Sequence, residues 1–153
     1  MAPELIGKIL VRNEAGSQIQ YTITEAEAYR GEEDQASHAR FGRTSRSGIM
    51  YGRGGLLYIY LIYGMYWMLN IVTGLDDIPQ AILIRGLKGL SGPGILTREL
   101  GINKSFHGED LITSNRIWIE NNPEKPVIIQ KPRVGIQYAG EPWKSLPWRF
   151  IGV

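Results

Sequence analysis

The amino-acid sequence predicts an α+β fold: one domain built on a curved, mostly antiparallel β-sheet, with flanking helices and a protruding β-hairpin. The 153 residues are enough for one hydrophobic core. Short runs rich in β-branched and aromatic residues alternate with turn residues, which is typical of strands. Only two short segments have the composition of a helix. We therefore expect residues 1–153 to form a single domain.

The first third of the chain is expected to hold two strands, a short helix and a loop. Residues 6–11 and 19–24 have strand character, with turn residues between them. Residues 25–29 continue the second strand. Residues 32–39 begin with acidic side chains that interact favourably with a helix N-terminus, which predicts a short helix. Residues 40–55 are rich in Gly, Ser and Arg and are expected to form a loop.

The most apolar stretch of the chain, residues 56–72, predicts the hairpin. Nearly every position is apolar or aromatic, so the spacing of a helix with one buried face fits it poorly. The tyrosines, the β-branched residues and the central Gly64 favour two strands joined by a tight turn. We expect strands at residues 57–62 and 66–72, with residues 63–65 at the tip.

The rest of the chain alternates strands with one helix. After a turn at residues 76–79, the sequence predicts a helix that Ser91 caps, that runs to Leu100 and that ends at Gly101. The remaining strands are expected at residues 80–87, 117–120, 127–130 and 148–153.

Composition excludes several classes of protein. Hydrophobic residues make up 43% of the chain and charged residues 21%, which is an ordinary balance for a globular protein. There is no cysteine, and the two histidines match no metal-ligand spacing, so we expect no metal and no disulfide. The N-terminus is a poor secretory signal, and the apolar stretch is too short and too polar to span a membrane. We expect a monomer in the cytoplasm, associated with the nucleoid, of a prokaryote, or in the nucleus of a eukaryote.

Positive charge is concentrated in two segments, although the net charge is only +2. Residues 38–54 hold four arginines and no acidic residue, and residues 125–149 hold five basic residues against Glu141. Such segments are consistent with solvated surfaces or with contacts to phosphates.

Four polar residues stand out in the strands. Strand alternation places Glu27 and Tyr29 on one side of the sheet. The simplest interpretation is a solvent-facing Glu and a half-buried Tyr on an edge strand. Asn70 lies in an apolar strand, where an unpaired amide costs about 1–3 kcal/mol, so it needs a specific reason to be there. Arg85 is a cation at the end of an equally apolar strand.

Five segments, in order over nearly the whole chain, resemble the alkyladenine (3-methyladenine) DNA glycosylase family. They are ITEAEAYRGEEDQASHARFGRT, LLYIYLIYGMYWMLNIV, AILIRGL, GPGILTRELGINKS and KPRVGIQYAGEPWKSLPWRF. The combination of EAY, IYGMY and PRVGI is highly specific. The resemblance implies a β-hairpin that inserts into the minor groove of double-stranded DNA. It also implies base-excision repair of damaged purines, such as 3-methyladenine, hypoxanthine and related alkylated bases, by hydrolysis of the N-glycosidic bond without a cofactor.

The resemblance also implies roles for individual residues. Glu27 matches the general base that activates a water, and Arg85 matches the residue that helps to hold this water and the carboxylate. Tyr29 and Tyr60 match the aromatic residues on either side of the flipped base, and His38 matches a pocket residue that forms a hydrogen bond toward it.

Three hairpin residues have implied roles in selecting and flipping the base. Asn70 matches the residue that disfavours guanine by crowding its exocyclic amine. Tyr63 matches the side chain that fills the gap in the duplex, and Met65 lies beside it. No lysine lies within the matching active-site motif, so we expect a monofunctional enzyme that does not cut the strand. The acid that protonates a neutral leaving base is not assigned, and water is a candidate.

Local charge suggests which residues contact DNA phosphates. The candidates are Arg40, Arg43, Arg46, Lys104 and Arg133. The chain departs from the family pattern between Arg85 and Ser91, where only five residues stand in place of a longer insert.

Two other functions are consistent with parts of the sequence. A catalytically silent module of the same fold that binds damaged DNA would keep Tyr63 and the basic loop but would not need Glu27. A sugar O-glycosidase would need a second catalytic carboxylate, and the sequence offers no clear partner. The presence of both Glu27 and Arg85 favours the DNA glycosylase.

Overall fold

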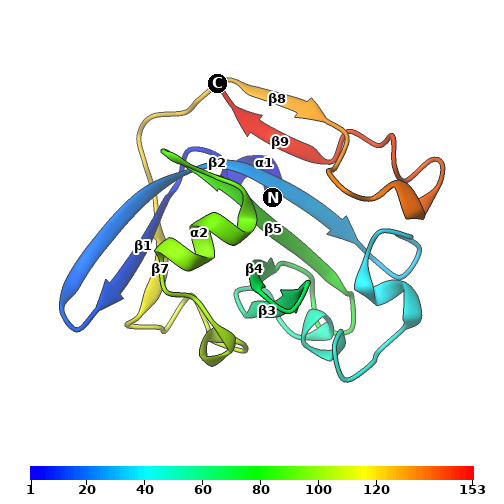
Figure 1. Cartoon of the computed structure of the whole chain (residues 1–153), viewed down its shortest axis with the longest axis horizontal. Coiled ribbons are helices and arrows are strands. Elements are labelled where there is room, and N and C mark those ends of the chain that lie inside the picture. The colour runs from blue at the N-terminus through cyan, green and yellow to red at the C-terminus, as the bar shows by residue number, and fades with distance from the viewer.

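A long strand, β2 (Ser17–Arg30), organises the sheet in the computed structural model, which describes residues 1–153. Its first half pairs with β1 (Ile9–Glu14), and its second half pairs with β5 (Gln80–Leu87). The short strand β9 (Arg149–Gly152) pairs with residues 25–27 of β2 (Figure 1). This part of β2 therefore has a neighbouring strand on each side.

The predicted hairpin is confirmed with the expected bounds. It consists of β3 (Leu57–Ile62) and β4 (Tyr66–Val72), which pair along their whole length, and β4 also pairs with β5. The turn between them has Tyr63 and Gly64 in the left-handed conformation, with φ angles of 50° and 64°. Such angles suit a tight hairpin turn.

The remaining elements are short and lie around this framework. The other strands are β6 (Leu90–Ser91), β7 (Ile117–Glu120) and β8 (Ile128–Lys131). The α-helices are α1 (Ala2–Leu5) and α2 (Pro93–Glu99). Four 3-10 helices complete the set: η1 (His38–Phe41), η2 (Gly48–Tyr51), η3 (Lys104–Phe106) and η4 (Gln137–Ala139). No helix is long and apolar enough to cross a membrane.

The strands form a mostly antiparallel sheet, as the sequence predicts. The order along the sheet is β3-β4-β5-β2-β1-β7; in addition, β6 pairs with β5, and β8 pairs with β9. Every pair is antiparallel. Helix α2 packs against β4 and β5, as Figure 1 shows.

The predicted helix at residues 32–39 is wrong, because the Asp34 side chain binds backbone N–H groups on both sides of it, including that of Ala36, which a helix would use. The Asp34 carboxylate accepts hydrogen bonds from the backbone N–H of Arg30 and of Ala36, at 3.0 Å each. These bonds stabilise turns instead of a helix. Only η1 forms at the end of this segment.

Several other boundaries differ by one or more residues, and the structure explains two of them. The first strand begins at Ile9 because α1 occupies the N-terminus and Gly7 turns the chain with a φ of 90°. Helix α2 begins at Pro93, after Gly92, so Ser91 does not cap it.

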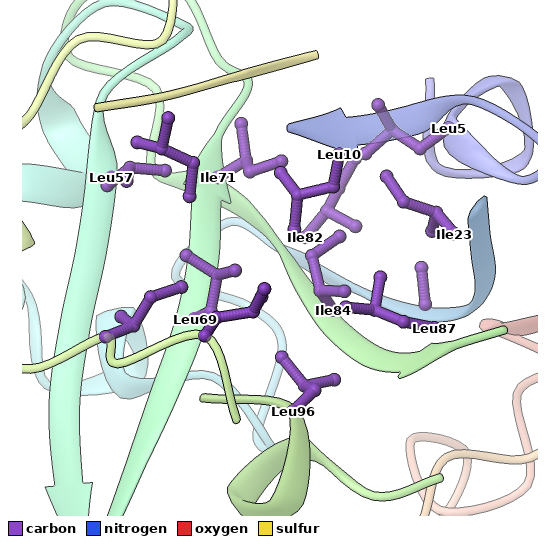
Figure 2. Close-up of a cluster of buried hydrophobic side chains, with 14 of the residues drawn as sticks. Leu5, Leu10, Ile23, Leu57, Leu69, Ile71, Ile82, Ile84, Leu87 and Leu96 are labelled. Carbon is purple, nitrogen blue, oxygen red and sulfur yellow. The ribbon is translucent and has the colours of Figure 1, made fainter. Parts of the chain in front are cut away.

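The largest hydrophobic core contains 19 buried residues between the sheet and α2. Figure 2 shows Ile23, Leu69, Ile84 and Leu96, which four elements contribute to this one cluster of buried side chains. A second, smaller cluster packs residues of the 39–51 segment against the hairpin and β5. It consists of Ala39, Met50, Tyr51, Tyr58, Val72 and Ala81. This second cluster holds the loop segment beside β3.

An irregularity in the β2–β5 pair places Arg85. Glu25 is opposite Gly86 and Ala26 is opposite Ile84, so Arg85 is the extra residue between two paired positions. Such a bulge changes the direction of a side chain. Arg85 points toward the carboxylates of β2 as a result.

Candidate active site

Glu27 lies in the part of β2 that β5 and β9 flank, and its side chain is fully buried. Its Oε1 accepts a hydrogen bond from the backbone N–H of Val134 at 2.7 Å. Its Oε2 accepts one from the Tyr29 hydroxyl at 2.8 Å, and Arg85 Nε lies 3.5 Å from Oε1. A carboxylate inside the protein is thus held at both of its oxygens.

The environment of Glu27 makes it a stronger base than an exposed glutamate. Burial raises its pKa above the ordinary value of 4.5, and the positive charge of Arg85 and the hydrogen bonds from Val134 and Tyr29 partly offset this effect. Burial also raises the pKa of Tyr29 well above 10, and the neighbouring Glu27 carboxylate raises it further. Tyr29 therefore stays protonated and donates to Glu27.

A small pocket opens beside Tyr29. Its free volume is about 20 Å³. Its lining residues are Tyr29, Ala36, Ser37, His38, Met50, Tyr58, Tyr60, Asn70 and Ala81. A space of this size holds about one water molecule, so the side chains that line it must move apart to admit a planar base. Tyr29 belongs to both the pocket and the hydrogen-bond network of Glu27, which joins the two.

Three aromatic rings form one wall of the pocket. The centroids of the His38 and Tyr60 rings are 4.6 Å apart and those of Tyr58 and Tyr60 are 5.0 Å apart. His38 Nδ1 lies 2.7 Å from the Tyr58 hydroxyl. With Nδ1 occupied, Nε2 is the nitrogen of His38 that is left for a ligand.

Asn70 is the buried amide in this wall. Its side-chain nitrogen donates to the backbone carbonyl of Tyr58 at 3.1 Å, across the β3–β4 pair. This bond satisfies the amide that the sequence singled out and fixes the direction of its side chain in the pocket.

The structure corrects the expectation that Arg133 contacts phosphate. Its guanidinium is fully buried and makes two hydrogen bonds to Asp34, at 2.7 and 2.9 Å. It also lies 4.7 Å from the centroid of the Tyr29 ring. Arg133 therefore ties the loop that carries Val134 to the segment after β2, and it is not available to DNA.

The other predicted basic residues remain at the surface, and Arg46 lies beside the pocket. The Arg46 guanidinium is 5.1 Å from the centroid of the Tyr60 ring. Arg40 stacks on Phe41 and Tyr138, whose centroids are 4.3 and 5.1 Å away, and Arg43 pairs with Asp77. Lys104 is exposed on η3 and is not one of the residues that line the pocket.

The tip of the hairpin is strongly exposed. The exposed fraction is 86% for Tyr63 and 64% for Met65. Tyr58, Tyr60 and Asn70 lie on the same two strands, so one hairpin carries both the pocket wall and this apolar tip.

Sequence reasoning missed the backbone N–H of Val134 and the side chain of Tyr58. A backbone donor leaves no mark on residue type, although the PRVGI segment containing Val134 was part of the resemblance. Tyr58 could have been found, because strand alternation places it on the same face as Tyr60. No group of three or more His, Asp or Glu side chains is arranged to hold a metal ion.

Comparison with known proteins shows the family to which this chain belongs. The family model described as methylpurine-DNA glycosylase matches residues 1–91 and 88–152. The two matched segments meet in the short connection between Arg85 and Ser91, where the sequence predicts that an insert is missing.

Individual relatives match over nearly the whole chain. The chain is 42% identical to a protein of Anaeromyxobacter sp. strain Fw109-5, covering 98% of this chain and 81% of the relative. It is 38% identical to one of Methanocella arvoryzae, covering 98% and 84%. It is 42% identical to one of Wolbachia pipientis, covering 98% and 83%. Each of the three carries the name "Putative 3-methyladenine DNA glycosylase".

The surroundings of His38 lead to a first prediction. Burial, followed by the charges of Arg46 and Arg40, lowers the pKa of His38 to about 4. In an NMR pH titration, we expect the imidazole to stay neutral until about pH 4, and Arg46→Gln should raise this pKa. Because an unfolded histidine binds its proton near pH 6.5, the folded protein should lose stability as the pH falls from about 6.5 to about 4. An imidazole that titrates near 6.5 in the folded wild type would contradict this description.

The buried Asp34–Arg133 pair leads to a second prediction. Asp34→Asn leaves a buried guanidinium without its counter-charge, which typically destabilises a protein by about 3–5 kcal/mol. Urea unfolding measures the loss. The matched control is Asp77→Asn in the exposed Arg43–Asp77 pair, which should change stability little. Equal effects of the two substitutions would show that burial of the Asp34 pair is unimportant.

Proposed function

Because the chain belongs to the methylpurine-DNA glycosylase family, we propose that it is a monofunctional DNA glycosylase of base-excision repair. It flips a damaged purine out of double-stranded DNA and hydrolyses the N-glycosidic bond with a water that Glu27 activates. The observation that carries the proposal is the hydrogen bond from Tyr29, which lines the pocket, to the fully buried Glu27 carboxylate. The expected lesions are 3-methyladenine, hypoxanthine and related alkylated purines.

Aromatic stacking supports the flipping step. Extruding a base costs a few kcal/mol, and less when the base is damaged or mispaired. Contacts with Tyr29 and Tyr60 can offset this cost at about 1–3 kcal/mol per stacked ring. A cationic alkylated purine gains further from the electron-rich faces of these rings.

The position of Glu27 supports general-base catalysis. Glu27 takes a proton from the water, the water oxygen forms a bond to C1′ of the sugar, and the electrons of the N-glycosidic bond go to the base. The charged carboxylate also stabilises the positive charge that develops on the sugar. General-base assistance typically contributes a factor of about 10²–10⁴ in rate. Cationic 3-methyladenine leaves as a neutral base, whereas hypoxanthine requires a proton, for which water is the candidate donor.

Arg85 supports the same step from the other side of the carboxylate. Its Nε is 3.5 Å from Glu27 Oε1, so its charge favours the ionised form that a base must have. The family resemblance further implies that its guanidinium helps to hold the attacking water. The role proposed for Arg85 therefore combines the orientation of the water with electrostatic support of Glu27.

The exposed tip of the hairpin supports the role of Tyr63 as a wedge in the duplex. Tyr63 fills the space that the flipped nucleotide leaves, and Met65 packs beside it against the neighbouring base pairs. The left-handed backbone at Tyr63 and Gly64 makes the turn tight and presents the tyrosine at its apex. Since Tyr60 lies three residues before Tyr63, the wedge and the pocket act on the same nucleotide.

Asn70 and the basic residues complete the proposed DNA contacts. Because its nitrogen is bound to Tyr58, Asn70 cannot turn away from the exocyclic amine of a guanine, which it disfavours. Arg40, Arg43, Arg46 and Lys104 contact phosphates, and His38 forms a hydrogen bond toward the flipped base through Nε2. Each neutralised phosphate should add about 0.9 to the salt dependence of binding.

A catalytically silent module that binds damaged DNA is the alternative within the same fold. It would need the hairpin and the pocket, but it would gain nothing from an ionisable carboxylate without solvent contact. Burying such a group is costly. Retention of Glu27 inside the protein therefore favours an enzyme.

The proposed function predicts that Glu27→Gln abolishes excision but retains binding. In single turnover on a hypoxanthine-containing duplex, the rate should fall by at least about 10²-fold, with lesion binding unchanged. The melting temperature should not decrease, because the neutral amide removes a buried charge. The matched control is Glu109→Gln. The Glu109 carboxylate lies 2.5 Å from Arg116 and outside the pocket, so this substitution should leave the rate unchanged. Equal rates for wild type and Glu27→Gln would remove Glu27 from the mechanism.

The wedge predicts a loss of affinity for lesion DNA on removal of the Tyr63 ring. Loss of one stacked ring costs about 1–3 kcal/mol, so Tyr63→Ala should weaken binding to a hypoxanthine duplex by about 5- to 150-fold. Ile112→Ala is the control, because Ile112 is also strongly exposed but lies outside the hairpin. Fluorescence anisotropy measures both. If the two variants bind equally well, Tyr63 does not act as a wedge.

A further inference from the structure

A second carboxylate, Glu25, lies two residues before Glu27 and has no role in the steps above. Its Oε1 accepts a hydrogen bond from Arg85 Nε at 3.2 Å and another from Arg149 NH1 at 3.1 Å. About a fifth of each of these three side chains is exposed: 18% for Glu25, 17% for Arg85 and 21% for Arg149. Glu25 thus links β5 to β9 beside the buried carboxylate.

The Arg85 side chain uses only one of its nitrogens for a hydrogen bond within the protein. Nε has a single N–H, which is donated to Glu25 at 3.2 Å, although Glu27 Oε1 is only slightly farther at 3.5 Å. The two terminal nitrogens of Arg85 make no hydrogen bond within the protein. Glu25 therefore holds the guanidinium by its inner nitrogen and leaves the outer donors free.

Arg149 is itself fixed, so Glu25 has a rigid partner on β9. Its Nε donates to the backbone carbonyl of Pro132 at 2.8 Å, two residues before the Val134 N–H that binds Glu27. Arg149 is also the residue directly opposite Glu27 in the β2–β9 pair. It therefore connects Glu25 to the loop that completes the site.

The charges around Glu27 balance. Glu25 and Glu27 are opposed by Arg85 and Arg149, and Arg133 is neutralised by Asp34. The other groups that face Glu27 are the Tyr29 hydroxyl from β2, the Val134 N–H from the loop after β8 and the Tyr60 hydroxyl from β3, whose pKa the charge of Glu27 helps to raise. Without Glu25, the carboxylate of Glu27 would face a surplus of positive charge and an Arg85 free to pair with it.

We propose that Glu25 is a positioning residue, which holds Arg85 away from a full ion pair with Glu27 and, together with Arg149, sets the charge at the base. This inference rests on the proposed glycosylase function. Without Glu25, Arg85 would donate a hydrogen bond to the carboxylate oxygen of Glu27 that must accept a proton from water. With Glu25 in place, the same arginine keeps free donors to orient that water.

The two halves of this role can be separated by substitution. Glu25→Ala removes both the acceptor and the charge, whereas Glu25→Gln keeps an oxygen acceptor for Arg85 and removes only the charge. Arg149→Gln removes the opposite charge, and Arg149→Lys retains it. Loss of the negative charge favours ionised Glu27 and lowers its pKa, and loss of the positive charge raises it.

The test is the single-turnover rate of hypoxanthine excision as a function of pH. Because Glu27 must be ionised, the rate falls as the pH drops through its pKa, which burial raises above 4.5. We expect this acidic limb to move down by about 0.5–1 pH unit in Glu25→Gln and up by a similar amount in Arg149→Gln. It should stay in place in Arg149→Lys and in the remote control Glu109→Gln. The plateau rate should fall at least about tenfold in Glu25→Ala and recover most of this loss in Glu25→Gln.

Each outcome decides a separate point. A wild-type protein that excises no damaged purine would refute the proposed function itself. An active wild type with an unchanged plateau rate in Glu25→Ala would refute the positioning role. Shifts in the same direction, or no shift, in Glu25→Gln and Arg149→Gln would refute the charge balance. If Glu25→Ala fails to fold, the shape-conserving Glu25→Gln decides the point. A plateau rate in Glu25→Gln as low as that of Glu27→Gln would then contradict the inference.

Discussion

A carboxylate without solvent contact is the constraint that shapes this protein. Removing Glu27 from water disfavours its charged form, so neighbouring groups must supply what water would have given. The Tyr29 hydroxyl, the Val134 N–H and the Arg85 guanidinium do so from β2, from the loop after β8 and from β5. Three segments that are distant in sequence must therefore be positioned accurately around one side chain, and the sheet provides this accuracy.

The sheet accomplishes this positioning through two irregular features. Strand β2 has a partner on both sides only at residues 25–27, where Glu27 lies. The bulge at Arg85 then directs a cation from an otherwise apolar strand toward Glu25 and Glu27. The buried Asp34–Arg133 pair ties the loop that carries Val134 to the segment that leads to the pocket. Polar groups inside the protein are thus retained where they define the site.

The sequence predicted the hairpin and β5 accurately, because strong β patterns and a central Gly64 leave few alternatives. It failed at residues 32–39, where the Asp34 side chain replaces helical hydrogen bonds. Among the site residues, resemblance pointed to Glu27, Tyr29 and Arg85, which the structure brings together. It could not reveal that Arg133 is buried against Asp34, because charge alone does not distinguish an internal ion pair from a surface cation.

Glu27, the aromatic pocket and the Tyr63 wedge are proposed to act on one flipped nucleotide. The most direct test is a crystal structure of Glu27→Gln bound to a duplex that contains hypoxanthine. We expect the hypoxanthine ring in the pocket between Tyr29 and Tyr60, the sugar C1′ next to residue 27, and Tyr63 in the gap left in the duplex. A hypoxanthine that remains stacked in the duplex, with the pocket empty and Tyr63 outside the helix, would contradict the claim.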